Sequence, residues 1–150
     1  MKKEYLELTR LIERLHRRFL DVLRAELGRM GIKELNAVQA LLLSNIGAEE
    51  IAIRDLVERG YYQGSNVSYN IKKLTDMGYL DQERSQHDRR SVTVRLTPKA
   101  MDVVKRVREL EDINAGNVES SGIKPADLTT ATDTLRRIEQ MWAEHIRYGG

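Results

Sequence analysis

Hydrophobic residues along the chain predict three long amphipathic helices that flank a middle segment of shorter elements. From Glu4 to Arg29, apolar residues recur every three or four positions, which is the spacing of one face of an α-helix. A second stripe starts at Pro98 and a third at Pro125. The sequence GNVESSG, residues 116–122, predicts a break between these two helices. The apolar face of the last helix is predicted to consist of Leu128, Ala131, Leu135, Ile138, Met141, Trp142 and Ile146.

The middle segment is predicted to contain three short helices. NAVQALLLSNIG begins with Asn36, a favourable N-cap residue, and carries Gln39 three positions later, which completes a capping box. Gly47 is expected to end this helix, and the next one, IRDLVERG, ends at Gly60. The third spans Gly64 to Met77, and Gly78 is expected to stop it. Its predicted buried face consists of Val67, Ile71 and Leu74.

A β-hairpin is predicted after the third helix, because the hydrophobic period changes to two residues from Tyr79 onward. Val92, Val94 and Leu96 alternate with polar residues, which indicates a half-buried strand. The segment Tyr79–Arg84 is expected to pair with this strand, so that SQHDRRS, residues 85–91, forms the tip of the hairpin. Thr97 is then expected to cap the next helix, with Pro98 in its first turn.

Three short helices and a hairpin are the parts of a winged helix-turn-helix module. The sequence therefore predicts a mainly α (α+β) fold, in which residues 35–97 form a DNA-binding lobe. Residues 1–34 and 98–150 supply long helices whose apolar stripes this small lobe cannot cover alone. The simplest partner for those stripes is a second copy of the chain, related by two-fold symmetry, so residues 1–34 and 98–150 are predicted to form a dimerisation region.

Composition narrows the possible functions. Hydrophobic residues make up 41% of the 150 residues, enough for a small core, and the formal net charge is only +2, so any positive potential must come from local clustering. The absence of cysteine excludes disulfides, thiolate metal sites and a thiol switch. No apolar run approaches the roughly 18 residues of a membrane-spanning helix. We therefore expect a soluble, cytoplasmic protein without a membrane partner.

The outer face of the third short helix has the residue types of a DNA-reading surface. Small polar side chains let a helix approach base edges in a major groove, where amides and hydroxyls donate or accept hydrogen bonds, and lysines suit phosphates. A solvated helix face is the alternative interpretation, but the hairpin that follows favours DNA. The candidate contacts on this helix are Ser65, Asn66, Ser68, Tyr69, Lys72 and Lys73.

The hairpin tip concentrates basic residues beside one acid. Asp88 and Arg90 are two positions apart, so on an extended strand they share a face, and the carboxylate can hold the guanidinium through a bidentate hydrogen bond. Arg90 is then the residue expected to enter a minor groove, and Arg89 is expected to contact a phosphate. An exposed turn with a local salt bridge is the alternative. The candidate contacts on the hairpin are Arg84, His87, Asp88, Arg89 and Arg90, with Arg95 as further support.

The run SQHDRRSVTVRLTPKA, residues 85–100, resembles the wing of the MarR family of bacterial transcription regulators. Asp88 and Arg90 match the D-x-R motif of that wing, and Leu96 and Thr97 match its L-T. NVSYNIKKLTDMGYL is similar to the recognition helix and following strand of the family. The resemblance covers essentially the whole chain, and it departs at Ala100, where members often carry a glycine.

This resemblance implies a homodimer whose first and last helices interlace and whose winged lobes each read half of a palindrome. It also implies that a small molecule often relieves repression by binding between the dimer helices and the DNA lobe. His16 lies on a helix face that the family would place near that cavity, and His16 and Phe19 are the candidate ligand contacts. A plain surface or interface histidine is the alternative for His16.

The sequence lacks the motifs of common metal, cofactor and catalytic sites. The three histidines form no pair at i and i+4 and no H-E-x-x-H, so no metal is expected, and no phosphate-binding or dinucleotide-binding loop indicates a cofactor. The sequence therefore predicts a sequence-specific regulator of transcription, and not an enzyme. We expect a homodimeric repressor on pseudo-palindromic double-stranded DNA, relieved by a small-molecule effector. A winged-helix module for protein interaction and an architectural DNA binder without ligand control are the alternatives.

Overall fold

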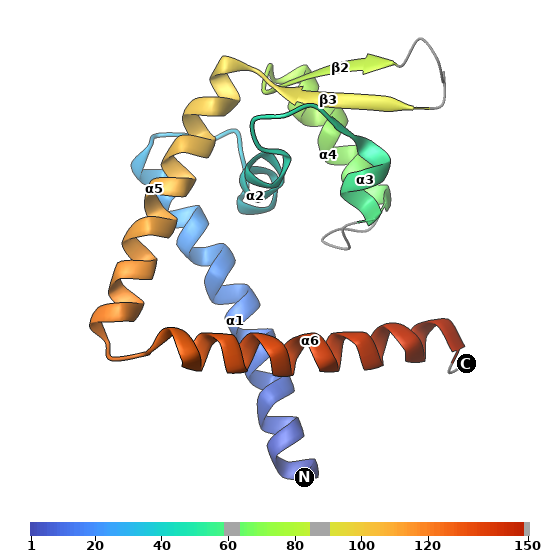
Figure 1. Cartoon of the computed structure of the whole chain (residues 1–150). Helices are drawn as coiled ribbons and strands as arrows, with labels where there is room; N and C mark the ends of the chain where they lie inside the picture. The colour runs from blue at the N-terminus through green and yellow to red at the C-terminus, as the bar shows by residue number, and fades with distance from the viewer. Residues whose placement is uncertain (59–63, 85–90, 149–150) are drawn as a thin grey trace. The chain divides into compact units, whose positions relative to one another are not determined.

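The computed structural model describes residues 1–58, 64–84 and 91–148, with Gly64 and Ser65 described by their backbone alone. The elements follow the predicted order of a long helix, three short helices, a hairpin and two long helices (Figure 1). They are α1 (Lys2–Arg29), α2 (Ala37–Ile46), β1 (Ile51–Ala52), α3 (Ile53–Glu58), α4 (Gly64–Asp76), β2 (Leu80–Arg84), β3 (Val92–Leu96), α5 (Pro98–Ser120) and α6 (Pro125–Tyr148).

Helix α1 joins the core only near its C-terminal end. Leu23, Glu26 and Leu27 are its buried residues, whereas Leu11, Leu15 and Phe19 of the same apolar stripe are exposed. The helix ends before Gly31, whose φ of 74° lies in the left-handed region that favours glycine. The predicted helix is therefore confirmed, but within one chain most of its apolar face has no cover.

The predicted capping box at the start of α2 is present. The side-chain oxygen of Asn36 accepts a hydrogen bond from the backbone N–H of Gln39 at 2.8 Å, and the Gln39 side chain accepts from the backbone N–H of Asn36 at 3.0 Å. These two bonds satisfy amide groups that the first turn of a helix leaves without partners. The helix ends at Gly47, as its sequence predicted.

The hairpin pairs in the predicted way, but the sheet contains one more strand than the sequence indicated. Strands β2 and β3 are antiparallel, with Leu80 opposite Leu96 and Arg84 opposite Val92. The short strand β1 pairs with the other edge of β3, giving the order β1-β3-β2. Two residues are too few to show a period of two, so the sequence alone carried no signal for β1.

The core lies where α2, α3 and α4 meet the sheet and the first half of α5. Leu56 of α3 and Val94 of the central strand are fully buried, and helix α3 contacts both α4 and β3. The largest fully buried side chains are Leu42, Leu43, Leu56, Ile71, Leu74, Leu80, Val67 and Val94. Aliphatic burial of this kind supplies roughly 1.5–3 kcal/mol per side chain, so this cluster fixes the arrangement of the short helices.

The predicted break over residues 116–122 is wrong at its start. Helix α5 continues through Gly116 and ends at Ser120, and the chain turns at Gly122, where φ is 90°. A single glycine lowers helix propensity by about 1 kcal/mol but does not by itself end a helix. The last helix begins at Pro125, as predicted.

Two compact units make up the chain, Met1–Leu110 and Glu111–Gly150. The first contains the core described above. The second contains the end of α5 and all of α6, and no residue of α6 is buried. Across the described parts of the chain, no helix is long and apolar enough to span a membrane.

Candidate nucleic-acid interface

Helix α4 presents the polar face that the sequence predicted. Val67, Ile71 and Leu74 are almost completely buried, and they determine which side of the helix faces outward. Ser65 was also predicted on this face, but its side chain lies outside the described residues. The predicted contacts that the structure places at the surface are Asn66, Ser68, Tyr69, Lys72 and Lys73. The structure thus brings five of the six candidates together on one helix face.

The charge on this face is positive. Residues 64–75 contain two lysines and no acid, and Asp76 is the first carboxylate of the helix. The ammonium group of Lys73 lies 5.5 Å from the centre of the Tyr69 ring, within the range of a cation–π contact. Asparagine and serine lie at the front of the face, and the lysines follow one turn later. This arrangement combines hydrogen-bonding groups for bases with cations for phosphates.

The buried side-chain amide of Gln39 links α2 to α4 through a hydrogen bond. Gln39 is only 4% exposed, and its side-chain N–H donates to the side-chain oxygen of Asn70 at 3.2 Å. The other end of the same amide accepts from the backbone N–H of Asn36, in the capping box of α2. One side chain therefore connects the start of α2 with the middle of α4.

The C-terminal end of α4 is joined to the start of α5. The Lys99 ammonium donates to the carbonyl oxygen of Met77 at 3.0 Å, and the Thr97 hydroxyl donates to that of Gly78 at 2.7 Å. Gly78 itself has a φ of 85° and ends the helix as predicted. These bonds satisfy carbonyl groups that a helix end leaves without partners, and they hold the last turn of α4 in place.

The wing is described only at its base. Arg84, the last residue of β2, and Arg95 of β3 are both exposed, and Arg95 lies opposite Asp81 in the strand register. The remaining predicted wing contacts, His87, Asp88, Arg89 and Arg90, lie outside the described residues. The pairing of Asp88 with Arg90 and the entry of Arg90 into a minor groove therefore stay predictions.

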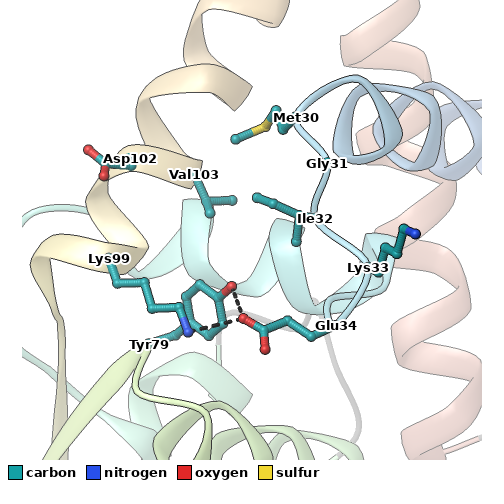
Figure 2. Close-up of a pocket in the computed structure, with 9 residues that line it drawn as sticks. All are labelled: Met30, Gly31, Ile32, Lys33, Glu34, Tyr79, Lys99, Asp102 and Val103. Atoms are coloured by element: carbon teal, nitrogen blue, oxygen red, sulfur yellow. Dashed lines mark hydrogen bonds and ion pairs between the residues drawn. The ribbon is translucent and has the colours of Figure 1, made fainter.

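A hollow of about 490 Å³ opens beside the junction of α4 and α5. Figure 2 shows the residues that line it. One oxygen of Glu34 accepts a hydrogen bond from the Tyr79 hydroxyl at 2.5 Å and another from the Lys99 ammonium at 3.0 Å. Lys99 also lies 4.4 Å from the centre of the Tyr79 ring. The residues around the hollow are Met30, Gly31, Ile32, Lys33, Glu34, Tyr79, Lys99, Asp102 and Val103.

Two of the polar groups around this hollow, Glu34 and Tyr79, have shifted pKa values. The hydrogen bond from Tyr79, followed by that from Lys99, lowers the pKa of Glu34. Burial, followed by the hydrogen bond to Glu34, raises the pKa of Tyr79. Near neutral pH, Glu34 is therefore a carboxylate and Tyr79 a neutral donor. This cluster could not be predicted from the sequence, because Glu34, Tyr79 and Lys99 come from segments that are far apart in the chain.

Several solved structures share the fold. The chain superposes on AbsC, a MarR family transcriptional regulator from Streptomyces coelicolor, with a TM-score of 0.74, 21% identity and coverage of 98% of this chain and 96% of that one. It superposes on a mutant of MarR from E. coli complexed with operator DNA with a TM-score of 0.71, 18% identity and coverage of 90% and 95%. The predicted winged fold with long terminal helices is thereby confirmed.

Comparisons of the amino-acid sequence agree with the structural comparisons. A family model described as a winged helix DNA-binding domain matches residues 35–100. The chain is also 38% identical, over 145 residues, to the exopolysaccharide II synthesis transcriptional activator ExpG of Rhizobium meliloti (strain 1021), and the alignment covers 97% of this chain and 75% of that protein. This chain belongs to the MarR family of winged helix-turn-helix transcriptional regulators. MarR-family proteins are DNA-binding regulators rather than enzymes, as the sequence predicted.

The predicted effector contacts of this MarR-family chain are exposed. His16 and Phe19 lie on the outside of α1, and neither lines the hollow beside Glu34. Within the described residues, no group of three histidine or acidic side chains is placed to hold a metal ion. A role of His16 and Phe19 in ligand binding stays a prediction.

One connection in this MarR-family lobe, the hydrogen bond between Gln39 and Asn70, was not predicted from the sequence. Gln39 was identified as a capping-box residue, but its second bond, to Asn70, was not predicted. Asn70 follows four polar candidate contacts in the sequence, so its residue type alone did not distinguish it from them. Its place beside the buried face of α4, next to Ile71, was the available signal.

Proposed function

We propose that this MarR-family regulator binds a pseudo-palindromic operator in duplex DNA as a homodimer, with one α4 in each of two major grooves. The observation that carries the proposal is the outer face of α4. It exposes five polar, aromatic and basic side chains, and residues 64–75 include no acidic residue. Asn66 and Ser68 are suited to base edges, and Lys72 to a phosphate. In the proposed complex, α4 supplies the base contacts of one half-site.

The wing adds a second contact to each half-site in this proposal. Arg90, oriented by Asp88, enters or follows the flanking minor groove, and Arg84 lies at the base of the same hairpin. Arginine suits this place because a narrow minor groove concentrates negative potential. Arg89 and His87 are assigned to the adjacent phosphates.

The apolar surface outside the core supports a homodimer. Leu11, Leu15 and Phe19 of α1 are exposed, and so are Leu128, Leu135 and Ile146 of α6. Each helix thus carries an exposed apolar stripe of a kind that is rare on a monomer, and a two-fold partner presents the same stripes in return. Two-fold symmetry would place the half-sites about one helical turn, roughly 34–36 Å, apart.

Two directions of regulation have support. Repression, relieved by a small-molecule effector that contacts His16 and Phe19, follows from the resemblance of the wing and recognition helix to the family. Activation is favoured by the 38% identity to ExpG, a transcriptional activator of exopolysaccharide II synthesis. Transcript levels in cells with and without this protein separate the two: targets rise on removal of a repressor and fall on removal of an activator.

DNA binding is tested by a salt series with the DNA upstream of the protein's own gene, beside a scrambled duplex of equal length. The proposal requires tight binding to the upstream DNA alone, with an affinity that falls steeply with salt as phosphates are neutralised. Equal binding to both duplexes favours an architectural DNA binder. No binding to either duplex at low salt favours a module for protein interaction.

A further inference from the structure

Two kinds of contact hold α4 in the winged lobe. Val67, Ile71 and Leu74 bury an aliphatic face of α4, and the bond from Gln39 to Asn70 lies at the edge of that face. Aliphatic contacts are non-directional, so they tolerate a small rotation of a helix about its axis. A hydrogen bond is directional and weakens steeply when its angle or length departs from the preferred values.

Gln39 is itself well fixed. Its side chain is held at one end by the backbone N–H of Asn36, and its own backbone N–H donates to the Asn36 side chain. Its donor group is therefore presented to Asn70 from a rigid helix start. Within the described residues, no buried side-chain polar atom is left without a hydrogen-bond partner, and both the nitrogen and the oxygen of the Gln39 amide have one.

We infer that Gln39 is a positioning residue for sequence selectivity, because its bond to Asn70 sets the rotation of α4 about its own axis. The inference rests on the proposed operator binding by α4. Gln39 does not contact DNA in this proposal. It determines instead where Asn66, Ser68 and Tyr69 stand relative to the bases.

The geometry indicates which contacts depend on this rotation. The side-chain tips of an α-helix lie about 5–6 Å from its axis, so a rotation of about 20° displaces them by about 2 Å. Hydrogen bonds from short side chains such as Asn66 and Ser68 do not survive that displacement. The long, flexible stems of Lys72 and Lys73 compensate for it at a phosphate. Loss of the Gln39 bond should therefore reduce selectivity without reducing general affinity for DNA.

The test uses full-length protein and a duplex that the wild type selects from a random pool. Affinity is measured for this duplex, for its single-base variants and for an unrelated duplex of equal length. The variants are Gln39→Leu, Asn70→Ala and the double variant. Asn36→Ala is the matched control, because it removes the side-chain cap of α2 but leaves the bond between Gln39 and Asn70 in place. Thermal melts set a temperature at which all four variants are folded.

Gln39→Leu and Asn70→Ala should each lower the ratio of selected to unrelated affinity by about tenfold, and relax several base positions at once. The double variant should lose no more than either single variant, because both remove the same bond. Affinity for the unrelated duplex and the salt slope should match the wild type, and Asn36→Ala should keep the wild-type ratio.

Three results would overturn the inference. An unchanged ratio in Gln39→Leu would show that aliphatic packing alone sets the rotation of α4. A loss in Asn70→Ala without one in Gln39→Leu would make Asn70 a direct DNA contact. An equal loss in Asn36→Ala would assign the effect to the stability of α2. A wild type that enriches no sequence from the pool would instead refute the proposed operator binding on which the inference rests.

Discussion

Arg106 of α5 donates a hydrogen bond to Glu26 of α1, with 3.1 Å between the guanidinium Nε and the carboxylate Oε1. The second carboxylate oxygen of Glu26 accepts from Arg29 at 2.8 Å. Glu26 is only 8% exposed, and a buried charge is costly unless it is paired. The two arginines supply that pairing. The bonds from Arg106 and then Arg29 lower the pKa of Glu26.

The bonds from Arg106 and Arg29 to Glu26 predict that the folded chain loses stability at low pH. Because the pKa of Glu26 is lower in the folded chain than its ordinary 4.5, the unfolded chain takes up protons first as the pH falls. The contribution of Glu26 is therefore present above about pH 4.5 and is lost as the pH falls through its folded pKa. Glu26→Gln should lower the free energy of unfolding by about 1–2 kcal/mol at pH 7, and by less at pH 3.5. Urea unfolding at fixed protein concentration measures both values.

Glu7→Gln is the control for this prediction, because Glu7 is an exposed acid on the same helix. It should change the free energy of unfolding little at either pH. An equal effect of the two substitutions at pH 7 would contradict the role assigned to Glu26.

Gly78 predicts a second effect on stability, through its backbone. Its φ of 85° is unfavourable for residues with a Cβ, although the space around it is open. Gly78→Ala should therefore cost roughly 1–2 kcal/mol of stability, and Gly78→Asn should cost less, since asparagine tolerates this conformation better. Gly116→Ala is the matched control within α5, where alanine should stabilise by roughly 0.5–1 kcal/mol. Thermal melts that give both alanine variants the same sign would refute this account.

The two kinds of contact assigned to α4 predict different binding defects. Asn66→Ala should lose roughly 1–3 kcal/mol at particular base pairs and leave binding to random DNA unchanged. Lys72→Ala should weaken binding to all sequences alike and reduce the salt slope by about one. Competition with single-base variants of the operator, repeated across a salt series, measures both effects. A uniform loss in Asn66→Ala would make Asn66 a backbone contact.

The sequence predicted the elements whose signals are local, and it missed those that depend on distant contacts. The Asn36–Gln39 capping box and the end of α4 at Gly78 follow from residues within one turn, and both are confirmed. Strand β1 and the bond from Gln39 to Asn70 form between segments that are far apart in the chain, so no periodicity revealed them. At Gly116 a local signal was overread, because one glycine lowers helix propensity by about 1 kcal/mol without ending a helix. The exposed polar side of α4 was predictable because burial of Val67, Ile71 and Leu74 determines it.

Substitution of the predicted wing residue Arg90 should cause a severe loss of operator binding without affecting the dimer. Arg90→Ala should weaken operator binding strongly while leaving the dimer intact, because Arg90 lies on the predicted wing and outside the predicted dimerisation region. Asp88→Ala should give a smaller loss, since it frees the arginine without removing its charge. Fluorescence anisotropy with operator DNA and sedimentation of the free protein measure the two properties. Wild-type affinity in Arg90→Ala would refute minor-groove entry by that residue.

The apolar face of α6 predicts the oligomeric state. Leu135 is 39% exposed in a single chain, and Leu128, Trp142 and Ile146 share its side of the helix. Leu135→Lys should raise the dissociation constant of the dimer by more than about tenfold, because an apolar interface then receives a charge. Gln140→Lys adds the same charge to the opposite side of α6 and should leave the dimer unchanged.

Truncation after Gly122 tests the same surface more severely, because it removes all of α6. It should abolish the dimer and leave the apolar stripe of α1 without a partner. Sedimentation velocity over a range of protein concentrations measures the dissociation constant of each variant. If the truncated chain were a soluble, folded monomer and Leu135→Lys stayed dimeric, the terminal helices would not be the dimer interface. The two winged lobes would then need another contact to hold their α4 helices one turn of DNA apart.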